Sequence, residues 1–200
     1  MTETLTVHSI YDIVLKEVIT VKKETYEKAR VRALEYYEKA HIILTDEEKK
    51  NVEVADFGLD DLDQTGLQLV TYVNTERCCA KEMVIFPHQT CPEHRHAPLP
   101  DYIGKEETFR CRYGTVYLYV DGEPTPNPVC HPPRGSEPYY TVSHEVVLHE
   151  GEQYTMYPNT RHWFQAGDHG AVVSEFSTMS VDEYDIFTDP RIKRIPTLED

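Results

Sequence analysis

Beyond residue 51 the chain is a succession of short runs rich in Val, Tyr, Thr and Phe, separated by turn-forming residues. This texture limits the fold more than any other feature of the sequence. Short strands at such density are typical of an antiparallel sandwich or barrel. We therefore expect a mainly β structure in residues 51–200, with strands at 67–74, 80–86, 107–113, 115–120, 142–148, 152–157, 162–166 and 171–176.

The first 50 residues have a different pattern, which predicts helices. Between residues 21 and 40, Tyr26, Ala29, Ala33 and Ala40 recur at helical spacing among charged residues, which is typical of an amphipathic helix. Thr45 followed by Glu48 matches a capping box at the start of a second helix. We expect residues 1–50 to decorate one edge or end of the sheet, where they could also supply a dimer contact. No linker is visible, so 200 residues predict one structural domain overall.

Composition excludes several classes of partner. The chain carries 35 acidic against 20 basic residues, a net charge of −15, which argues against nucleic acid and anionic membranes as partners. Five cysteines without a C-x-x-C motif predict neither a disulfide framework nor a thiolate zinc site. The N-terminal stretch has an early Glu and no long apolar region, so we expect no signal peptide, and no apolar run approaches bilayer length. A cytoplasmic location is the resulting expectation.

The segment around residues 91–114 carries the chemistry. His94 and His96 stand two residues apart and would share one face of a strand, with Glu107 opening the next strand and His162 as a third imidazole. The alternative to a shared site is that these histidines are ordinary surface or core residues. However, H-x-H, a carboxylate, Gly114 seven residues after it and a later P-x-x-x-H together resemble the two cupin motifs. Such a shell suits a divalent metal, for which we expect manganese, with zinc, iron, cobalt and nickel as alternatives.

Two further ionisable residues could serve proton transfer. Lys105 would share a face with Glu107, although spacing alone favours a surface lysine at a loop end. Glu175 lies in the apolar run AVVSEFST, on one face with Val173 and Ser177, and is either a buried base or an outward-facing carboxylate. A metal that holds a sugar's carbonyl and neighbouring hydroxyl acidifies the C–H between them, and a positioned base can then carry the proton.

The arginines near the motifs and the proline-rich stretch are each expected to have a structural role rather than a role in the site. Four arginines surround the motifs and should point outward into salt bridges; if they pointed inward they would form a phosphate pocket. They are Arg95, Arg110, Arg112 and Arg161. The proline-rich stretch at residues 123–138 is expected to be a surface loop, with a lid over a barrel mouth as the alternative.

Taken together, several motifs resemble the D-lyxose isomerase family of cupin sugar isomerases. They are ADFGLDDLDQTGLQLVTYVNTERCCAKEMV, PEHRH, K-x-E and TRHWF, and the likeness runs from about Asp56 to the C-terminus. The resemblance implies a single antiparallel, jelly-roll-like cupin barrel. It also implies a metal-dependent isomerase, usually a homodimer, that interconverts D-lyxose with D-xylulose and often D-mannose with D-fructose.

By position, the resemblance also assigns roles to individual residues. It makes His94, His96, Glu107 and His162 the metal ligands and Lys105 and Glu175 the catalytic pair. It also makes residues 180–194 an acidic segment that closes the site, with Asp182, Asp189 and Arg191 as substrate contacts.

The chain departs from the family pattern in two places. The spacer 97–104 is longer than usual, which puts the sugar preference in question, and Asn159 stands where a glycine is usual after Pro158. Because Asn tolerates positive φ better than most residues, we expect the turn to survive. The alternatives to a D-lyxose-type isomerase are a phosphosugar isomerase on the same barrel, a metal-dependent cupin dioxygenase and a non-catalytic sugar-binding cupin.

Overall fold

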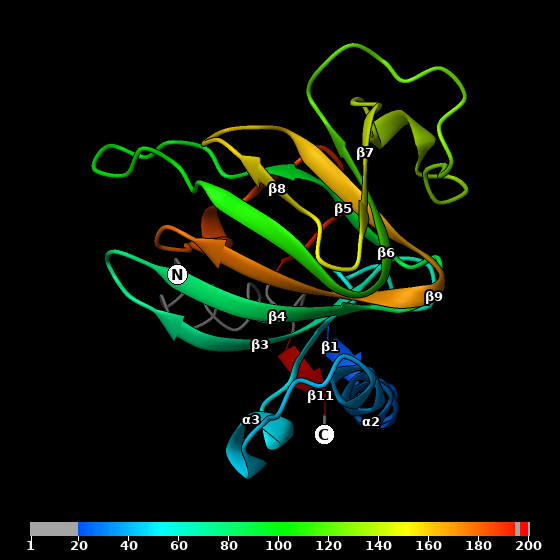
Figure 1. The fold of residues 1–200 in the computed structure, drawn as a ribbon, viewed down its shortest axis with the longest axis vertical. Helices are drawn as coiled ribbons and strands as arrows, with labels where there is room; N and C mark the ends of the chain where they lie inside the picture. The colour runs from blue at the N-terminus through cyan, green and yellow to red at the C-terminus, as the bar shows by residue number, and fades with distance from the viewer. Residues whose placement is uncertain (1–19, 195–196, 200) are drawn as a thin grey trace, which may run out of the picture.

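The computed structural model describes residues 20–194 and 197–199, and its main feature is a nine-stranded sheet that curls into a barrel (Figure 1). All strand pairs in this sheet are antiparallel. Its strands are β2 (Glu53–Ala55), β3 (Leu67–Asn74), β4 (Cys79–Ile85), β5 (Thr90–Arg95), β6 (Glu107–Val120), β7 (His144–His149), β8 (Gln153–Met156), β9 (His162–Ser177) and β10 (Ile186–Phe187). A second, two-stranded parallel sheet joins β1 (Thr20–Lys22) to β11 (Thr197–Glu199). The expected cupin barrel is confirmed.

Strands β6 and β9 are longer than the sequence predicted, because each was expected as two strands. The glycines that suggested breaks instead bend continuous strands. The β6–β9 register jumps from Gly114–Ala171 to Val116–Ala166, and Gly114 and Gly170 both have φ +73°. On one side of the bend β9 pairs with β5, and on the other side with β4. Each long strand therefore contributes to two walls of the barrel.

The other predicted strands lie close to their expected bounds. Residues 67–74 coincide with β3, and the run at 80–86 is β4, one residue earlier. The runs at 142–148 and 152–157 are β7 and β8, with ends shifted by one or two residues. The spacing of His94 and His96 predicted a strand at this position, and that strand is β5. The short strands β2 and β10 were not predicted.

Both expected helices are present on the outside of the sheet. Helix α2 (Lys23–Lys39) packs Ala33 and Tyr37 against Val84, and Tyr37 Oη donates a hydrogen bond of 2.8 Å to the backbone oxygen of Glu82. Helix α3 (Asp46–Lys50) begins at the predicted capping box, in which Thr45 and Glu48 bond to one another's backbone. Figure 1 shows both helices below β3 and β4. Residues 1–19 of the expected helical segment lie outside the described residues.

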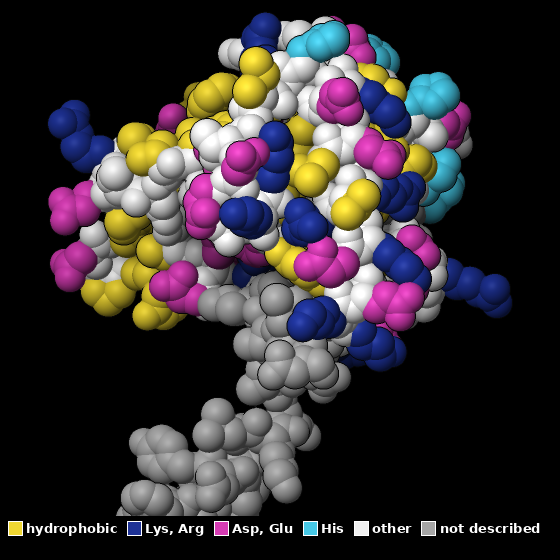
Figure 2. Space-filling view, turned by 90° about the horizontal axis from the view of Figure 1, so that it is seen from below, with side chains coloured by type: hydrophobic (Ala, Val, Ile, Leu, Met, Phe, Trp, Pro, Cys, Tyr) yellow, Lys and Arg dark blue, Asp and Glu magenta, His cyan; other side chains and the backbone are white. Residues whose placement is uncertain are grey.

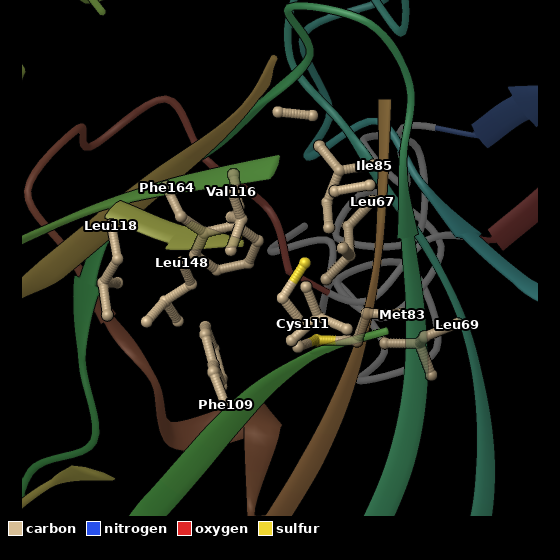
Figure 3. Close-up of a cluster of buried hydrophobic side chains, with 14 of the residues drawn as sticks. Leu67, Leu69, Met83, Ile85, Phe109, Cys111, Val116, Leu118, Leu148 and Phe164 are labelled. Atoms are coloured by element: carbon tan, nitrogen blue, oxygen red, sulfur yellow. The ribbon is translucent and has the colours of Figure 1, made fainter. Parts of the chain in front are cut away.

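The barrel interior is filled by apolar side chains from most of its strands. Figure 3 shows two groups, one around Phe109, Phe164 and Leu118 and the other around Leu67, Met83 and Ile85. Each large side chain buried in this way stabilises the fold by about 1.5–3 kcal/mol relative to exposure. Phe109 of this interior also contacts the buried ring of His162, so the apolar core borders the polar groups at one end of the barrel.

The charged surface, the cysteines and the helices bear on the classes of partner considered from composition. Acidic and basic side chains are interspersed over the face that carries α2, seen from below in Figure 2. All five cysteines are free thiols. Among the described helices, none has the length and apolar character needed to cross a membrane.

The proline-rich loop between β6 and β7 is a surface loop, as expected, but it is anchored. It contains the 3-10 helix η2 (Glu137–Tyr139), and its Cys130 is buried with Tyr119, Val142 and Trp163 in a small cluster outside the barrel. Tyr119 and Trp163 stack with ring centroids 3.9 Å apart. The loop therefore rests on the outer wall of the barrel.

Substituting Gly114 tests the bend in β6 and β9. A Cβ at Gly114 would lie 2.1 Å from the backbone oxygen of Gly170, whereas Gly151, at φ +87°, has nothing within 4 Å. We expect Gly151→Ala to lower the free energy of unfolding by about 1 kcal/mol through backbone strain alone. Gly114→Ala should lower it by roughly 3 kcal/mol or more, since the clash adds to the strain. Urea denaturation measures both, and equal losses would show that the bend tolerates a side chain.

Candidate active site

Three histidines and a carboxylate meet at one end of the barrel. His94 lies near the end of β5, His96 just after it, Glu107 opens β6 and His162 opens β9. His94 and His96 point to the same side, as their spacing predicted, and their ring centroids are 4.9 Å apart. The pairing of β5 with β9 sets His94 directly opposite His162. One ring nitrogen from each histidine falls within 4.8 Å of the others.

Each ring is oriented through its Nδ1 atom. Nδ1 of His94 lies 2.8 Å from the backbone oxygen of Pro92, and Nδ1 of His162 lies 3.0 Å from that of Thr160. Nδ1 of His96 lies 2.5 Å from Oδ1 of Asp185. With Nδ1 bonded to an acceptor, Nε2 is the nitrogen left for a ligand.

The donor set fits a divalent cation. The Nε2 atoms of His96 and His162 are buried and form no hydrogen bond within the part of the chain that the structure describes. Oε1 of Glu107 lies 3.1 Å and 3.2 Å from these two atoms without hydrogen-bond geometry, so all three atoms face one point. Buried polar atoms without partners are costly, and a bound metal would satisfy them. The histidine triad can therefore hold a metal.

Burial and neighbouring charges set the protonation of these groups. Burial, helped by the adjacent histidines, holds the pKa of His94 well below its usual value, and burial also lowers the pKa of His162. Burial and Lys105 oppose protonation of His96, but Glu107 and Asp185 outweigh them and raise its pKa to about 9. Two of the three rings are thus neutral at pH 7, the form that binds metals, while a cation at His96 must displace a proton.

Lys105 and Glu175 form a buried ion pair beside Glu107. Nζ of Lys105 lies 2.9 Å from Oε2 of Glu107 and 3.0 Å from Oε1 of Glu175, and all three side chains are at most 4% exposed. The surface position that spacing alone favoured for Lys105 is therefore wrong. Burial acts against the charge of Lys105, but the carboxylates Glu107 and Glu175 outweigh it and raise its pKa well above the usual value. Lys105 is thus a charged hydrogen-bond donor inside the site.

Most of these residues line a pocket that has both polar and apolar side chains. Lys105, Glu107 and Glu175 line it together with His94 and His96. Its apolar lining includes Phe57, Leu67, Leu69, Met83, Phe109 and Phe164. Apolar side chains combined with convergent polar groups are typical of small-molecule binding sites.

The three residues expected as substrate contacts lie in different places. Asp182 lines the pocket, where it pairs with Lys81 at 2.8 Å and with Arg194 at 2.9 Å. Asp189 and Arg191 are outside the pocket lining and pair with each other at 2.6 Å. Arg191 also donates a hydrogen bond of 2.9 Å to Ser136, so this pair ties residues 180–194 to the proline-rich loop.

The four arginines near the motifs point away from the pocket, as expected. Arg95 donates to Asn159, Arg110 to Gln153 and Arg112 to Ser174. Arg161 lies 3.8 Å from Glu93 and is the one member of this group with a carboxylate at ion-pair distance within the described chain. The phosphate pocket that inward-facing arginines would have formed is therefore not built from these residues.

Among the pocket-lining side chains that sequence reasoning did not assign to the site are Lys81, Asp185, Phe187 and Arg194. Lys81 shares its strand face with Met83 and Ile85, so alternation along β4 could have found it. Asp185, Phe187 and Arg194 come from residues 180–194, hereafter the C-terminal segment, whose irregular sequence gives no periodic signal. Arg194 pairs with Glu53 at 2.5 Å as well as with Asp182.

Both departures from the family pattern leave the ligand positions in place. Asn159 adopts φ +66°, as expected for a residue replacing glycine, and its backbone N–H donates to the backbone oxygen of His96. In the long spacer, Tyr102 Oη donates a hydrogen bond of 2.8 Å to the backbone oxygen of Met179. The spacer is thus attached beside the C-terminal segment.

Comparison with known proteins decides the family. The family model described as D-lyxose isomerase matches residues 35–200. The chain belongs to the D-lyxose isomerase family. A D-lyxose/D-mannose isomerase of Thermosediminibacter oceani is 65% identical over 180 residues, which cover 90% of this chain and 99% of that protein. A D-lyxose ketol-isomerase of a Thermofilum species is 61% identical over 176 residues, covering 88% and 98% of the two chains. This member of the family is therefore a sugar isomerase.

Solved structures support the barrel of this D-lyxose isomerase family member. The L-ribose isomerase of Acinetobacter sp. DL28, in complex with L-ribose, matches with a TM-score of 0.76 at 17% identity. That match covers 90% of this chain and 98% of the other. The L-ribose isomerase of Cellulomonas parahominis matches with a TM-score of 0.75, also at 17% identity and with the same coverage. At this identity the likeness establishes the fold.

Two histidines of β9 provide a matched test of the metal site. His162 is 1% exposed within the triad, whereas His169 on the same strand is exposed. We expect His162→Ala to lose bound Mn²⁺ after dialysis, because one of the ring nitrogens is removed, and His169→Ala to retain it. Elemental analysis of the dialysed proteins measures the stoichiometry. Wild-type Mn²⁺ content in His162→Ala would exclude this histidine as a ligand.

Proposed function

We propose that the protein interconverts D-lyxose with D-xylulose, and D-mannose with D-fructose, using a divalent metal held by His94, His96, Glu107 and His162. The names of the two relatives at 61% and 65% identity support the substrates. The buried, mutually facing donor atoms support the ligand set. Manganese remains our preferred ion, since a carboxylate beside imidazoles, with positions left for water or sugar oxygens, suits it.

The Lys105–Glu175 pair is the observation that carries the proposed chemistry. An aldose–ketose isomerase must move one proton between neighbouring carbons and another between neighbouring oxygens. A carboxylate and an ammonium group 3.0 Å apart in the pocket lining supply a proton acceptor and a proton donor at adjacent positions. A metal-binding cupin without catalysis, or one that activates oxygen, has no evident need for this pair.

The bound cation supplies Lewis acidity at the carbonyl and adjacent hydroxyl oxygens of the sugar. The residues of the chain do the rest. Lys105 and Ser177 both donate to Oε1 of Glu175, and so Oε2 is the oxygen that we assign to the substrate proton. Glu107 and Glu175 hold Lys105 in its charged form, so that it carries the proton that the reaction places on oxygen. The apolar side chains of the pocket lining exclude water from the reacting carbons.

The proton transfers then balance in two steps. Glu175 takes the proton from C2 of the aldose, the electron pair of that C–H bond forms the C1–C2 double bond, and Lys105 gives a proton to O1. The product is a neutral enediol. In the second step the O2 hydroxyl returns a proton to Lys105 as C2=O forms, and C1 takes the proton held by Glu175.

The remaining site residues complete the proposal. Asp182, held by Lys81 and Arg194 in the pocket wall, is the expected substrate contact that we retain. Asp189 and Arg191 bind one another outside the pocket lining, and we assign them to anchoring the C-terminal segment instead. A homodimer and a cytoplasmic location stay predictions of the sequence.

The proposed reaction is tested by ketose formation from free and phosphorylated sugars. We expect Mn²⁺-loaded protein to convert D-lyxose and D-mannose, to lose this activity with a chelator and to regain it when Mn²⁺ is returned, because the cation polarises the reacting oxygens. Ketose measured colorimetrically gives the rates. Turnover of sugar phosphates alone, or turnover that survives complete metal removal, would contradict the proposal.

Glu175→Gln tests the base directly. The amide keeps the shape of the side chain but cannot accept a proton, so we expect kcat to fall by roughly 10²–10⁴-fold. Mn²⁺ content should be unchanged, since Glu175 is not a proposed ligand. Glu106→Gln is the matched control, because Glu106 is exposed beside Lys105 and should keep wild-type turnover. Unchanged turnover in Glu175→Gln would remove this residue from the mechanism.

A further inference from the structure

His96 is oriented differently from the other two histidines of the triad. His94 and His162 each bond through Nδ1 to the backbone oxygen of the residue two positions earlier, Pro92 and Thr160. Because each contact joins residues only two positions apart, it does not depend on a remote part of the chain. His96 instead bonds to the carboxylate of Asp185, which lies 89 residues away in the C-terminal segment. The orientation of one proposed ligand thus depends on a remote part of the chain.

The Asp185–His96 contact is buried and short enough to hold the ring in place. The side chains of Asp185 and His96 are 6% and 7% exposed, and Oδ1 lies 2.5 Å from Nδ1. A carboxylate that accepts a hydrogen bond from the second ring nitrogen fixes the tautomer and direction of a ligating histidine and strengthens it as a ligand. The Nε2 atom of His96 is consequently aimed at Glu107, at 3.1 Å.

The segment that carries Asp185 is docked on the strand that carries the ligands. Strand β10 pairs Phe187 with His94 and Ile186 with Arg95 of β5. The Phe187 ring stacks on the His94 ring, with centroids 5.2 Å apart and an interplanar angle of 28°. Thr188 continues the contact, because its backbone N–H and its hydroxyl both donate to Glu93. Two of the four proposed ligands therefore touch this segment.

We propose that Asp185 is a positioning residue through which docking of the C-terminal segment and metal affinity are coupled. This inference rests on the metal site of the proposed function. If the docked segment holds His96 in its ligating orientation, the docked state binds metal more tightly than the undocked state. Linkage then requires the reciprocal effect, so that bound metal stabilises the docked segment to the same degree.

The first half of the test measures Mn²⁺ affinity by equilibrium dialysis of the full-length variants. Asp185→Ala removes the acceptor, and we expect its Kd for Mn²⁺ to rise about 10–100-fold. Asp185→Asn keeps an oxygen acceptor without the charge and should fall between wild type and Asp185→Ala. Glu183→Ala is the matched control, because Glu183 is an exposed acidic residue of the same segment. It should bind Mn²⁺ like the wild type.

The second half measures hydrogen exchange of residues 180–194 with and without Mn²⁺, and its main comparison uses the wild type, so it does not depend on the folding of a variant. We expect Mn²⁺ to slow exchange in this segment of the wild type, and to slow it less in Asp185→Asn. The inference is overturned if Asp185→Ala binds Mn²⁺ with wild-type affinity. It is also overturned if Mn²⁺ leaves the exchange rates of residues 180–194 in the wild type unchanged. Either result leaves the proposed isomerase standing, because that proposal depends on the ligands and on ketose formation.

Discussion

The barrel depends on a bend that β6 and β9 make together at Gly114 and Gly170. The two glycines approach so closely that the backbone oxygen of one occupies the space of a side chain on the other. Because of this bend, both strands leave one wall of the barrel and enter the next. It also sets the start of β6, with Glu107, near the start of β9, with His162. The meeting of Glu107 with His162 thus follows from backbone geometry that only glycine adopts without strain.

Charge alternation is what allows so many ionisable groups to be buried at this end. Glu107 neighbours Lys105, which neighbours Glu175. Around the same pocket Lys81 and Arg194 hold Asp182, and Arg194 reaches Glu53. Burying a charge is expensive unless an opposite charge and hydrogen bonds accompany it. The arrangement therefore contributes little net stability, but it fixes the positions of the groups to which we assign the chemistry.

The features readable from sequence were those set by local pattern. Alternation placed His94 and His96 on one face, and the capping box placed the start of α3, because both depend on near neighbours. The continuity of β6 through Gly114 was missed, because a glycine suggests the end of a strand until its cross-strand partner is known. The catalytic role expected for Lys105 came from the family resemblance, because its spacing alone favoured a surface position. Asp185 was unreadable because its partner is 89 residues away.

The pocket is completed by the C-terminal segment, which supplies Asp182, Asp185 and Arg194. Lys81 meets Asp182 across 101 positions, and Arg194 meets Glu53 across 141. Contacts of such sequence separation require long loops to close, and they form late in folding when the framework that they join already exists. During synthesis every strand of the barrel wall from β2 to β9 is made before the C-terminal segment. A growing chain can therefore build these strands first, and the pocket acquires its remaining lining only after the C-terminal segment has been made.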